Sequence, residues 1–255
     1  TASVGLKKTL LAVKDAYRKA KFAGIACGIK NVGLGHGSED GGRAMITVEP
    51  DGTVVVRTGF TEMGQGLFTV QIQTLCEETG LDPKLCRAVT DTRYALDCSQ
   101  TTGSRGTLLG CQAVKAAAQK LKADLACADL KELAGKEYYG EFIVNDTHPL
   151  GYTGQNVKTH ITYGFATQVV ILDDAGKLKK VIAAHDVGRV MNPVLLAGQI
   201  EGSIHMGLGY ALTEELQLKD GYIASKDLRA LGILRAKDMP EVECIFIEEE
   251  EPAGP

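Results

Sequence analysis

Hydrophobic positions near the start of the chain first follow a helical and then a strand-like pattern. Apolar residues recur every three or four positions and would share one face of a helix: Leu6, Leu10, Val13, Tyr17 and Ala20. This spacing predicts an amphipathic helix over residues 5–21. A strand-like stretch follows over residues 22–30, and the glycine-rich residues 31–42 are expected to form a loop.

Two stretches, residues 43–59 and 166–188, are typical of β-hairpins because each has two β-rich runs around a turn signal. The first turns at Pro50-Asp51-Gly52. Each hairpin is followed by a loop and a helical pattern, and each of these units contains a Gly-Gln dipeptide, Gly64-Gln65 or Gly198-Gln199. Hairpins that alternate with helices predict an α+β fold rather than a doubly wound parallel sheet.

The remaining elements follow from apolar spacing and from capping residues. Residues 67–79 are predicted to be helical up to Gly80, and residues 85–90 to form a short strand. A polar loop then leads into a long helix whose buried side is expected to carry Leu108, Val114, Ala118, Leu121 and Leu125. Residues 131–158 are weakly patterned and suggest one or two strands with loops. Asn192 and Pro193 are suited to the N-cap and first position of the last long helix.

We expect the chain to consist of two parts. Residues 1–158 would hold the first hairpin, the first Gly-Gln loop and an anion-binding helix. Residues 159–255 would hold the second hairpin and a glycine-rich helix.

Composition excludes several classes of function. The chain has 255 residues, of which 44% are hydrophobic, with a net charge of −4 and no dense block of Lys and Arg, so a nucleic-acid surface is not expected. No apolar stretch reaches the roughly 18 residues of a membrane span. The seven cysteines include no C-x-x-C pair and the five histidines no H-x-x-x-H pair, so no metal site is predicted. Scattered, reduced thiols suggest a cytoplasmic protein.

The stretch "GFTEMGQGLFT" places Gly64, Gln65 and Gly66 between a hairpin and a helix. A dinucleotide-binding loop is disfavoured, because Thr69 occupies the third glycine position and the preceding strand closes a hairpin. A plain turn with no ligand remains an alternative. The amide of Gln65 favours a ligand, because two donors and an acceptor suit the edge of a heterocycle.

A second stretch, "TTGSRGTLLG", precedes the long helix and combines hydroxyl groups, bare backbone and one positive charge. Its candidate ligand residues are Thr101, Gly103, Ser104, Arg105 and Thr107. Free N–H groups at a helix start attract anions, and a nearby arginine strengthens the attraction. The alternative is a serine N-cap beside a solvated arginine. No Walker pattern is present, so hydrolysis of nucleoside triphosphates is not indicated.

The third stretch, residues 192–216, has four glycines inside one helical pattern. Gly198, Gly202 and Gly209 fall within roughly 40° of one another at 100° per residue. Such a bare stripe allows a flat ligand or another backbone to come close. Tight packing of protein against the helix is the alternative.

Together these stretches resemble a known family. The segments "GFTEMGQGLFT", "TTGSRGTLLGCQAV", "HDVGRVMNP" and "GQIEGSIHMGLGYALTEEL" occur in the same order in the large subunits of molybdenum hydroxylases, which include xanthine dehydrogenase and aldehyde oxidase. The resemblance covers the chain from about residue 22 onward. It implies the molybdopterin-binding part of such a subunit.

The resemblance also implies roles for individual residues. Gln65 and Gln199 would hydrogen-bond the pterin of a molybdopterin cofactor with molybdenum, next to Gly64, Gly66 and Gly198. Residues Thr101, Gly103, Ser104, Arg105 and Thr107 would offer hydroxyl and N–H groups to the pterin and its phosphate. In bacterial members the cofactor often carries a cytosine dinucleotide, which would need a longer anion site.

The implied reaction is hydroxylation of a purine, another N-heterocycle or an aldehyde, with water as the oxygen source and with xanthine dehydrogenase as the favoured type. Its electrons would leave through [2Fe-2S] and FAD centres on other domains or subunits. The family's catalytic glutamate, in a G-x-G-E motif, would lie beyond Pro255, so no catalytic residue is assigned and this piece alone is expected to be inactive. A cofactor-free scaffold domain and a non-redox nucleotide-binding module remain alternatives.

Overall fold

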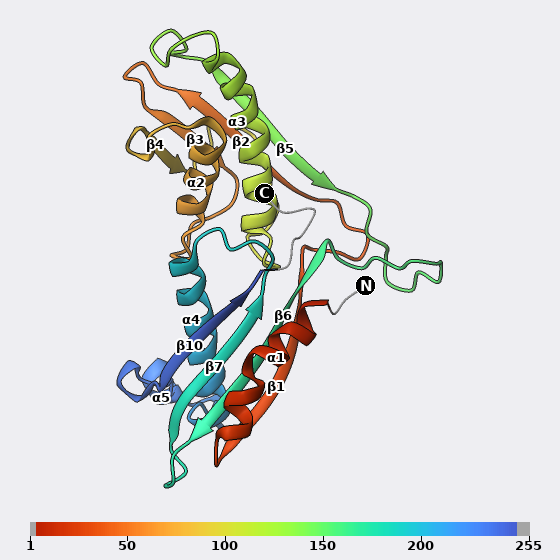
Figure 1. Ribbon diagram of the computed structural model, residues 1–255, viewed down its shortest axis with the longest axis vertical. Coiled ribbons are helices and arrows are strands. Elements are labelled where there is room, and N and C mark those ends of the chain that lie inside the picture. Colours follow the sequence, from red (N-terminus) through yellow and green to blue (C-terminus); the bar gives the residue numbers. More distant parts are fainter. Residues whose placement is uncertain (1–3, 249–255) are drawn as a thin grey trace. The chain divides into compact units, whose positions relative to one another are not determined.

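The computed structural model describes residues 4–248 and divides them into two compact units (Figure 1). Unit 1 combines residues 4–29 with residues 165–248, and unit 2 consists of residues 30–164. The ends of two strands pass the boundary between them. Each unit has its own sheet and its own hydrophobic core, and each is described by itself below.

Unit 2 is built on a four-stranded sheet with the order β4-β3-β2-β5. Its strands are β2 (Asp40–Val48), β3 (Val54–Thr58), β4 (Cys86–Val89) and β5 (Glu137–Val144), and its helices are α2 (Leu67–Thr79) and α3 (Cys111–Leu125). Strands β2 and β3 form the predicted antiparallel hairpin, and β4 pairs in parallel with β3. The expected loop over residues 31–42 is shorter than predicted, because β2 already begins at Asp40 to pair with β5.

The core of unit 2 lies between its sheet and its two helices. Ala44, Ile46, Val54 and Val56 of the hairpin pack against apolar side chains of α2 and α3. Glycine lets α3 approach β5 closely: a Cβ atom at Gly140 would lie 2.2 Å from the carbonyl oxygen of Ala113.

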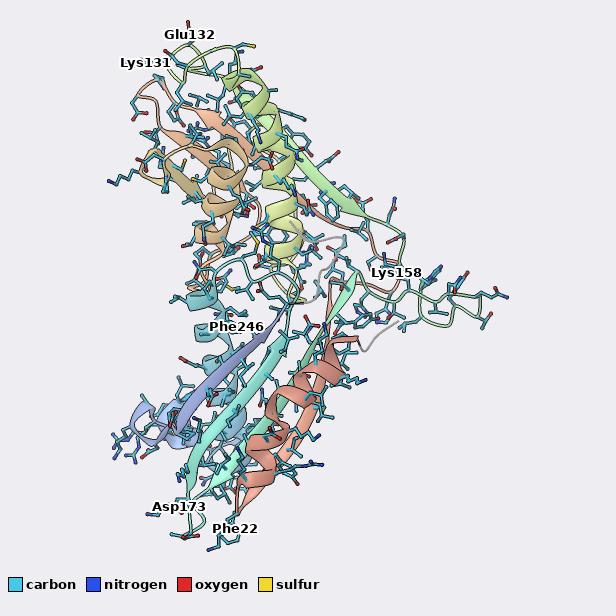
Figure 2. The ribbon with its side chains drawn as sticks, in the orientation of Figure 1. Phe22, Lys131, Glu132, Lys158, Asp173 and Phe246 are labelled. Carbon is cyan, nitrogen blue, oxygen red and sulfur yellow. The ribbon has the colours of Figure 1, made fainter. Side chains whose placement is uncertain are left out.

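Helix α2 keeps its predicted bounds. It ends at Gly80, whose left-handed φ of 78° lets its N–H donate to the carbonyl of Cys76. Beyond α3, Figure 2 shows Lys131 and Glu132 on the turn that leads to β5.

Unit 1 is built on a second four-stranded sheet, with the order β1-β6-β7-β10. Its elements are α1 (Val4–Lys19), β1 (Ala23–Val32), β6 (Thr162–Leu172), β7 (Leu178–Asp186), α4 (Pro193–Leu212), β8 (Leu218–Lys219), β9 (Tyr222–Ile223), α5 (Leu228–Leu231) and β10 (Glu241–Ile247). Strands β6 and β7 form the second predicted hairpin, and β10 pairs in parallel with β7. Figure 2 shows Phe22 and Asp173 at one end of this sheet.

The two long helices of unit 1 cover opposite faces of its sheet. Successive side chains of a strand point to opposite faces, and β7 uses both sets. Val181 and Ala183 pack against α4, whereas Ile182 and Ala184 pack on the side of α1. In Figure 1, α1 lies along one face of this sheet.

Helix α1 forms as predicted, but the residues that it buries differ from the predicted face. Leu10 is 42% exposed and Tyr17 is 39% exposed, whereas Thr9 and Val13 are fully buried. Small residues face the sheet because the helix lies close to it: a Cβ atom at Gly5 would lie 1.8 Å from a carboxylate oxygen of Asp186. Thr9 also hydrogen-bonds the hydroxyl of Thr167 on β6, at 2.9 Å. The predicted face is therefore partly right, because Val13 is buried as expected whereas Leu10 and Tyr17 are exposed and Thr9 takes a buried position.

The two units share an order of strands. In each, a hairpin is followed by a loop, a helix and a strand that pairs in parallel with the second strand of the hairpin. The fourth strand lies beside the first strand of the hairpin, and it is β5 in unit 2 and β1 in unit 1. The repeated hairpin, loop and helix that the sequence suggests are thus present in the α+β fold.

The compact units differ from the expected division at residues 158 and 159. The junction at residues 164 and 165 is close to that point, but unit 1 also includes residues 4–29. The physical reason is that β1 hydrogen-bonds β6, which brings the start of the chain into the sheet of the second half.

Among residues 4–248, no helix is both long enough and apolar enough to cross a membrane.

Candidate functional site

The first Gly-Gln loop lies in unit 2, between β3 and α2. Gly64 and Gly66 have φ angles of 102° and 83°, which only glycine adopts without strain, so both glycines are required by the turn. Helix α2 begins at the next residue, Leu67, with Gly66 as its N-cap residue. The loop is therefore a sharp turn directly into a helix, as the sequence predicts.

The carboxylate of Glu62 fills the start of α2. Its Oε1 accepts hydrogen bonds from the N–H groups of Gly64 (2.9 Å) and Gly66 (3.0 Å), and its Oε2 accepts one from Phe68 (2.9 Å). Burial alone would raise the pKa of Glu62, but these hydrogen bonds from the backbone outweigh it and lower the pKa. The anion at this helix terminus is thus supplied by the protein itself.

The side chain of Gln65 is folded back onto its own loop. Its Oε1 accepts from the N–H of Met63 at 2.5 Å, and its Nε2 donates to the carbonyl of Thr61 at 2.8 Å. A primary amide has two N–H donors and an oxygen with two lone pairs, so each end keeps one further hydrogen-bonding position. Gln65 is half-buried, and its amide is held in place before any ligand arrives.

The stretch 101–107 forms a second sharp loop in the same unit. Gly103 and Ser104 have φ angles of 66° and 54°. The left-handed region is costly for a serine, and such residues cluster at functional sites. The side chains of Ser104 and Thr107 are exposed. The helix that follows starts with a π-helical turn, Gly106–Gly110, before α3 proper, and π turns are frequent at functional sites.

The structure brings these two loops together. The N–H of Thr61 donates to the hydroxyl oxygen of Thr101 at 2.9 Å, across 40 residues of sequence. Near the same point, a Cβ atom at Gly106 would lie 3.4 Å from the side chain of Leu67, the first residue of α2. The two glycine-rich stretches of unit 2 therefore form one composite site at the starts of two helices.

A buried ion pair fixes the base of this site. Arg105 Nη1 donates to Asp40 Oδ1 at 2.6 Å, and the two side chains are 0% and 1% exposed. Arg105 Nη2 donates to the carbonyl oxygens of Cys98 and Gln100, and the guanidinium lies 5.2 Å from the centre of the Phe60 ring. One side chain thus ties the start of β2, the segment before the 101–107 loop, and the first Gly-Gln loop to one another.

The expected role of Arg105 needs correction. Its charge was predicted either to face a phosphate directly or to be solvated, but the side chain is fully buried and paired with Asp40. Among residues 4–248, two buried side-chain atoms lack a hydrogen-bond partner, Oε1 of Gln71 and Nε of Arg105, so one N–H of the Arg105 guanidinium remains unused. Arg105 therefore shapes the loop that carries the exposed hydroxyls, and its positive charge is already neutralised within the fold.

The second Gly-Gln dipeptide lies in unit 1, on α4. Asn192 caps this helix by accepting from the N–H of Leu195 at 3.0 Å, and Pro193 is its first residue, as predicted. Gln199 therefore lies in the second turn and not at the helix start, where unpaired N–H groups are found. Both Gly198 and Gln199 are exposed. Gln199 can contribute its side-chain amide but no free backbone donor.

The glycine stripe of α4 is not explained by packing within unit 1. A Cβ atom at Gly198 or Gly202 would meet no atom within 4 Å, and neither would one at Gly207, which lies on the opposite side of the helix. Gly209 is the exception, because a Cβ atom there would lie 2.5 Å from a carboxylate oxygen of Glu214. The bare face of α4, which carries Gly198 and Gly202, is thus not covered by side chains of unit 1 and could contact a ligand or another protein surface.

Two residues that position the site were not singled out from the sequence. Asp40 appears there only as one acidic residue of a glycine-rich stretch, and no local pattern pairs it with Arg105, 65 residues away. Glu62 carries a detectable signal, because an acidic residue shortly before a helix start is a common cap. Within the part of the chain that the structure describes, no three His, Cys, Asp or Glu side chains gather closely enough to hold a metal ion.

Comparison with known proteins assigns the family. The family model of the molybdopterin cofactor-binding domain matches residues 3–240. The chain belongs to this family. The match includes both Gly-Gln dipeptides and the 101–107 loop, so all of the candidate residues lie inside the molybdopterin cofactor-binding domain.

Two relatives of this molybdopterin cofactor-binding domain are named as molybdenum-binding subunits. The chain is 26% identical over 253 residues to the aldehyde oxidoreductase molybdenum-binding subunit PaoC of Escherichia coli O157:H7, covering 90% of this chain and 34% of the relative. It is 26% identical over 255 residues to the xanthine dehydrogenase molybdenum-binding subunit of the same organism, covering 82% of this chain and 33% of the relative. The chain thus spans about a third of the length of these relatives.

Solved structures share the fold. The aldehyde oxidoreductase from Desulfovibrio gigas matches with a TM-score of 0.75 and 20% identity, covering 97% of this chain and 29% of that protein. The CO dehydrogenase from Oligotropha carboxidovorans matches with a TM-score of 0.72 and 20% identity, covering 98% of this chain and 36% of that protein.

We predict that the Glu62 cap stabilises unit 2 in a pH-dependent way. Because the pKa of Glu62 is lower in the folded protein, its contribution is present above the ordinary carboxyl pKa of 4.5 and is lost as the pH falls through the lowered value. The substitution Glu62→Gln should cost about 1–2 kcal/mol at pH 7, measured by urea unfolding. The difference from the unsubstituted protein should shrink towards zero in acid.

The matched control is Glu39→Gln, because the Glu39 side chain is 68% exposed and its contact with Arg43 is long, at 3.7 Å. It should change stability by about 0.5 kcal/mol or less. A Glu62→Gln effect that equals the control, or that stays constant with pH, would contradict the proposed cap.

We predict strong coupling between Asp40 and Arg105. Arg105→Met or Asp40→Asn alone should destabilise unit 2 by about 3–5 kcal/mol, because each breaks a buried ion pair and Arg105→Met leaves the carboxylate unpaired. The double variant should cost clearly less than the sum of the two. The control Arg87→Met removes an exposed arginine of β4 and should cost about 0.5 kcal/mol or less. Additive single effects, measured by denaturant unfolding, would show that the pair is not coupled.

Proposed function

We propose that this chain binds the pterin and phosphate of a molybdopterin cofactor, as part of a xanthine dehydrogenase-like molybdenum hydroxylase. The observation that carries the proposal is the hydrogen bond between Thr61 and Thr101, which joins the two loops of unit 2 into one site. Family membership supports the cofactor, and the geometry supports the choice of residues.

The chemistry of the donors fits a phosphate at the 101–107 loop. Ser104 and Thr107 present exposed hydroxyls, and the left-handed backbone at Gly103 and Ser104 lies directly before a helix start, where N–H groups attract anions. Glu62 already occupies the start of α2, and its negative charge would repel a phosphate there. The phosphate end is therefore assigned to residues 101–107 and not to the Gly64–Gly66 turn.

A heterocycle fits at Gln65. The amide is fixed by Met63 and Thr61 and keeps one donor and one acceptor for the polar edge of a ring. Gly64 and Gly66 remove side chains where the ring would approach, and a Cβ atom at Gly64 would meet no atom within 4 Å. Gln199 is exposed beside Gly198. On the basis of the family resemblance, we assign its amide to a second contact with the pterin.

When bound, the cofactor would supply the redox chemistry of hydroxylation, with water as the oxygen source. The residues of this chain would bind and orient the cofactor, and none of them is assigned to a proton transfer. The proposed substrate is a purine such as xanthine, another N-heterocycle or an aldehyde. The names of the relatives, which include an aldehyde oxidoreductase and a xanthine dehydrogenase, support this range. A cytosine dinucleotide form of the cofactor would extend past the 101–107 loop.

The proposed partners are the remainder of a large subunit and domains or subunits that carry [2Fe-2S] and FAD. An apolar surface of unit 1 supports a protein neighbour. Its exposed residues on α4 and on the segment that follows are Val194, Met206, Tyr210, Leu212, Leu216, Leu218, Tyr222, Ile223 and Leu228. An apolar area of this extent favours contact with other protein over contact with water. We propose a cytoplasmic location for the assembled enzyme.

Two other functions make different predictions about ligands. A non-redox nucleotide-binding module would use the 101–107 loop for a nucleotide and would have no use for Gln199. A cofactor-free scaffold would use the bare face of α4 for protein contact alone. Isothermal titration would favour the first alternative if a cytidine nucleotide bound tightly and a pterin did not.

We predict that both glutamines retain the cofactor. In the full-length enzyme, Gln65→Ala and Gln199→Ala should each lower the molybdopterin content, because each removes hydrogen bonds worth about 1 kcal/mol or more, a several-fold change in retention. The content is measured as molybdenum and released pterin per protein. Gln119→Ala, at an exposed glutamine of α3, is the matched control and should leave the content unchanged. Full metal and pterin content in both variants would overturn the assignment.

A further inference from the structure

Two cysteines of unit 2 meet although they are ten residues apart in the sequence. Cys76 lies in the last turn of α2, and Cys86 is the first residue of β4. Their Sγ atoms are 3.8 Å apart, which is a contact between two thiols and not a bond. The absence of a C-x-x-C motif hides this pair from the sequence, because the fold and not the local spacing brings the two sulfurs together.

The backbone around the pair is firmly held. Gly80 closes α2 with its left-handed turn, and Asp82 caps the 3₁₀ turn Pro83–Leu85 by accepting from Lys84 at 2.9 Å. Leu81 and Ala88, on either side of that turn, pack against the core of unit 2. The two sulfurs are therefore kept close by the packing of α2 against β4 and do not depend on a chance encounter.

The distance suits the formation of a disulfide. A disulfide bond is about 2.05 Å long, so the sulfurs have about 1.75 Å to close from 3.8 Å. A rotation about the Cα–Cβ bond of either cysteine moves its sulfur by this order while the backbone stays in place. Among the seven cysteines, all of which lie in the described part of the chain, no other pair of sulfurs is within contact distance.

We propose that Cys76 and Cys86 form a redox-reactive dithiol that oxidises to a disulfide joining the end of α2 to the start of β4. The proposal concerns a modification site and does not depend on which cofactor the protein binds. A disulfide here would fix the far end of the helix that begins at the Gly64–Gly66 turn. With 13 residues, α2 places about 20 Å between the two ends.

The oxidation balances with a small disulfide such as glutathione disulfide as oxidant. The thiolate of Cys76 attacks one glutathione sulfur, which forms a mixed disulfide and releases one glutathione thiolate. The sulfur of Cys86 then attacks Cys76 Sγ and expels the second glutathione thiolate. Two protein S–H bonds and one glutathione S–S bond are replaced by one protein S–S bond and two glutathione S–H bonds, so the protein loses two electrons and two protons.

The surroundings of the two thiols raise their pKa values, which makes the oxidation slow at neutral pH but does not prevent it. Burial raises the pKa of Cys76, and burial together with the neighbouring Cys76 raises the pKa of Cys86 to about 12. The carboxylate of Asp82 adds to both shifts. The less perturbed thiol, Cys76, is therefore the first attacker. The hydrogen bond with Cys86 lowers the pKa of Cys76 but does not outweigh burial, so the thiolate is not strongly stabilised and the reduced form gains little from it.

The test is peptide mapping of the full 255-residue chain after incubation with glutathione disulfide at mildly alkaline pH, which offsets the raised pKa values. Trypsin should release residues 58–84 and 85–87 as one linked species that is two hydrogen atoms lighter than the separate peptides. The count of free thiols should fall from seven to five. Amide exchange in the last turn of α2 should slow several-fold in the oxidised protein and return to its original rate after reduction.

Serine variants provide the controls. Cys76→Ser and Cys86→Ser should each abolish the linked species, whereas Cys127→Ser, which removes an exposed cysteine, should leave it unchanged. Peptide mapping of the unsubstituted chain keeps the test decisive even if a variant fails to fold. Seven free thiols after oxidation, glutathione attached to both cysteines, or a linkage of Cys76 to another cysteine would each overturn the proposal.

Discussion

The buried ion pair between Arg105 and Asp40 is the interaction on which the candidate site depends. Arg105 Nη1 and Asp40 Oδ1 are 2.6 Å apart, and both side chains are almost completely shielded from water. Removing two charges from water is costly, and close geometry with further hydrogen bonds must offset that cost. Arg105 meets the requirement with bonds to the carbonyls of Cys98 and Gln100 and with the face of the Phe60 ring. The pair thereby sets the position of the loop that follows.

The other contacts of the site depend in turn on the position that this ion pair gives to Arg105. With Arg105 fixed, Ser104 takes a left-handed conformation that presents its hydroxyl and backbone at a helix start. Thr101 then accepts from Thr61, which connects this loop to the Gly64–Gly66 turn. Glu62 caps α2, so the negative charge near that turn comes from the protein and would direct the phosphate of a cofactor to the neighbouring loop. The proposed division of work between pterin and phosphate follows from these contacts.

Sequence patterns predicted the local elements well, because periodicity and capping residues determine them. Both hairpins, the end of α2 at Gly80 and the Asn192 cap of α4 are present as expected. The sequence did not predict contacts between distant residues. Asp40 pairs with Arg105 only through the fold, the buried face of α1 depends on how closely that helix approaches its sheet, and Cys76 meets Cys86 only through packing. The resemblance identified the family, whereas the role of Arg105 required the structure.

The central claim is that the two loops of unit 2 each hold one part of the same cofactor, the pterin at one loop and the phosphate at the other. Hydrogen–deuterium exchange of the full-length enzyme, compared with and without its molybdopterin cofactor, tests this most directly. The account predicts that peptides spanning residues 61–66 and residues 101–107 are protected together in the loaded enzyme, and that the end of α2 near Gly80 is unaffected. Protection of only one of the two loops, or of neither, would contradict it.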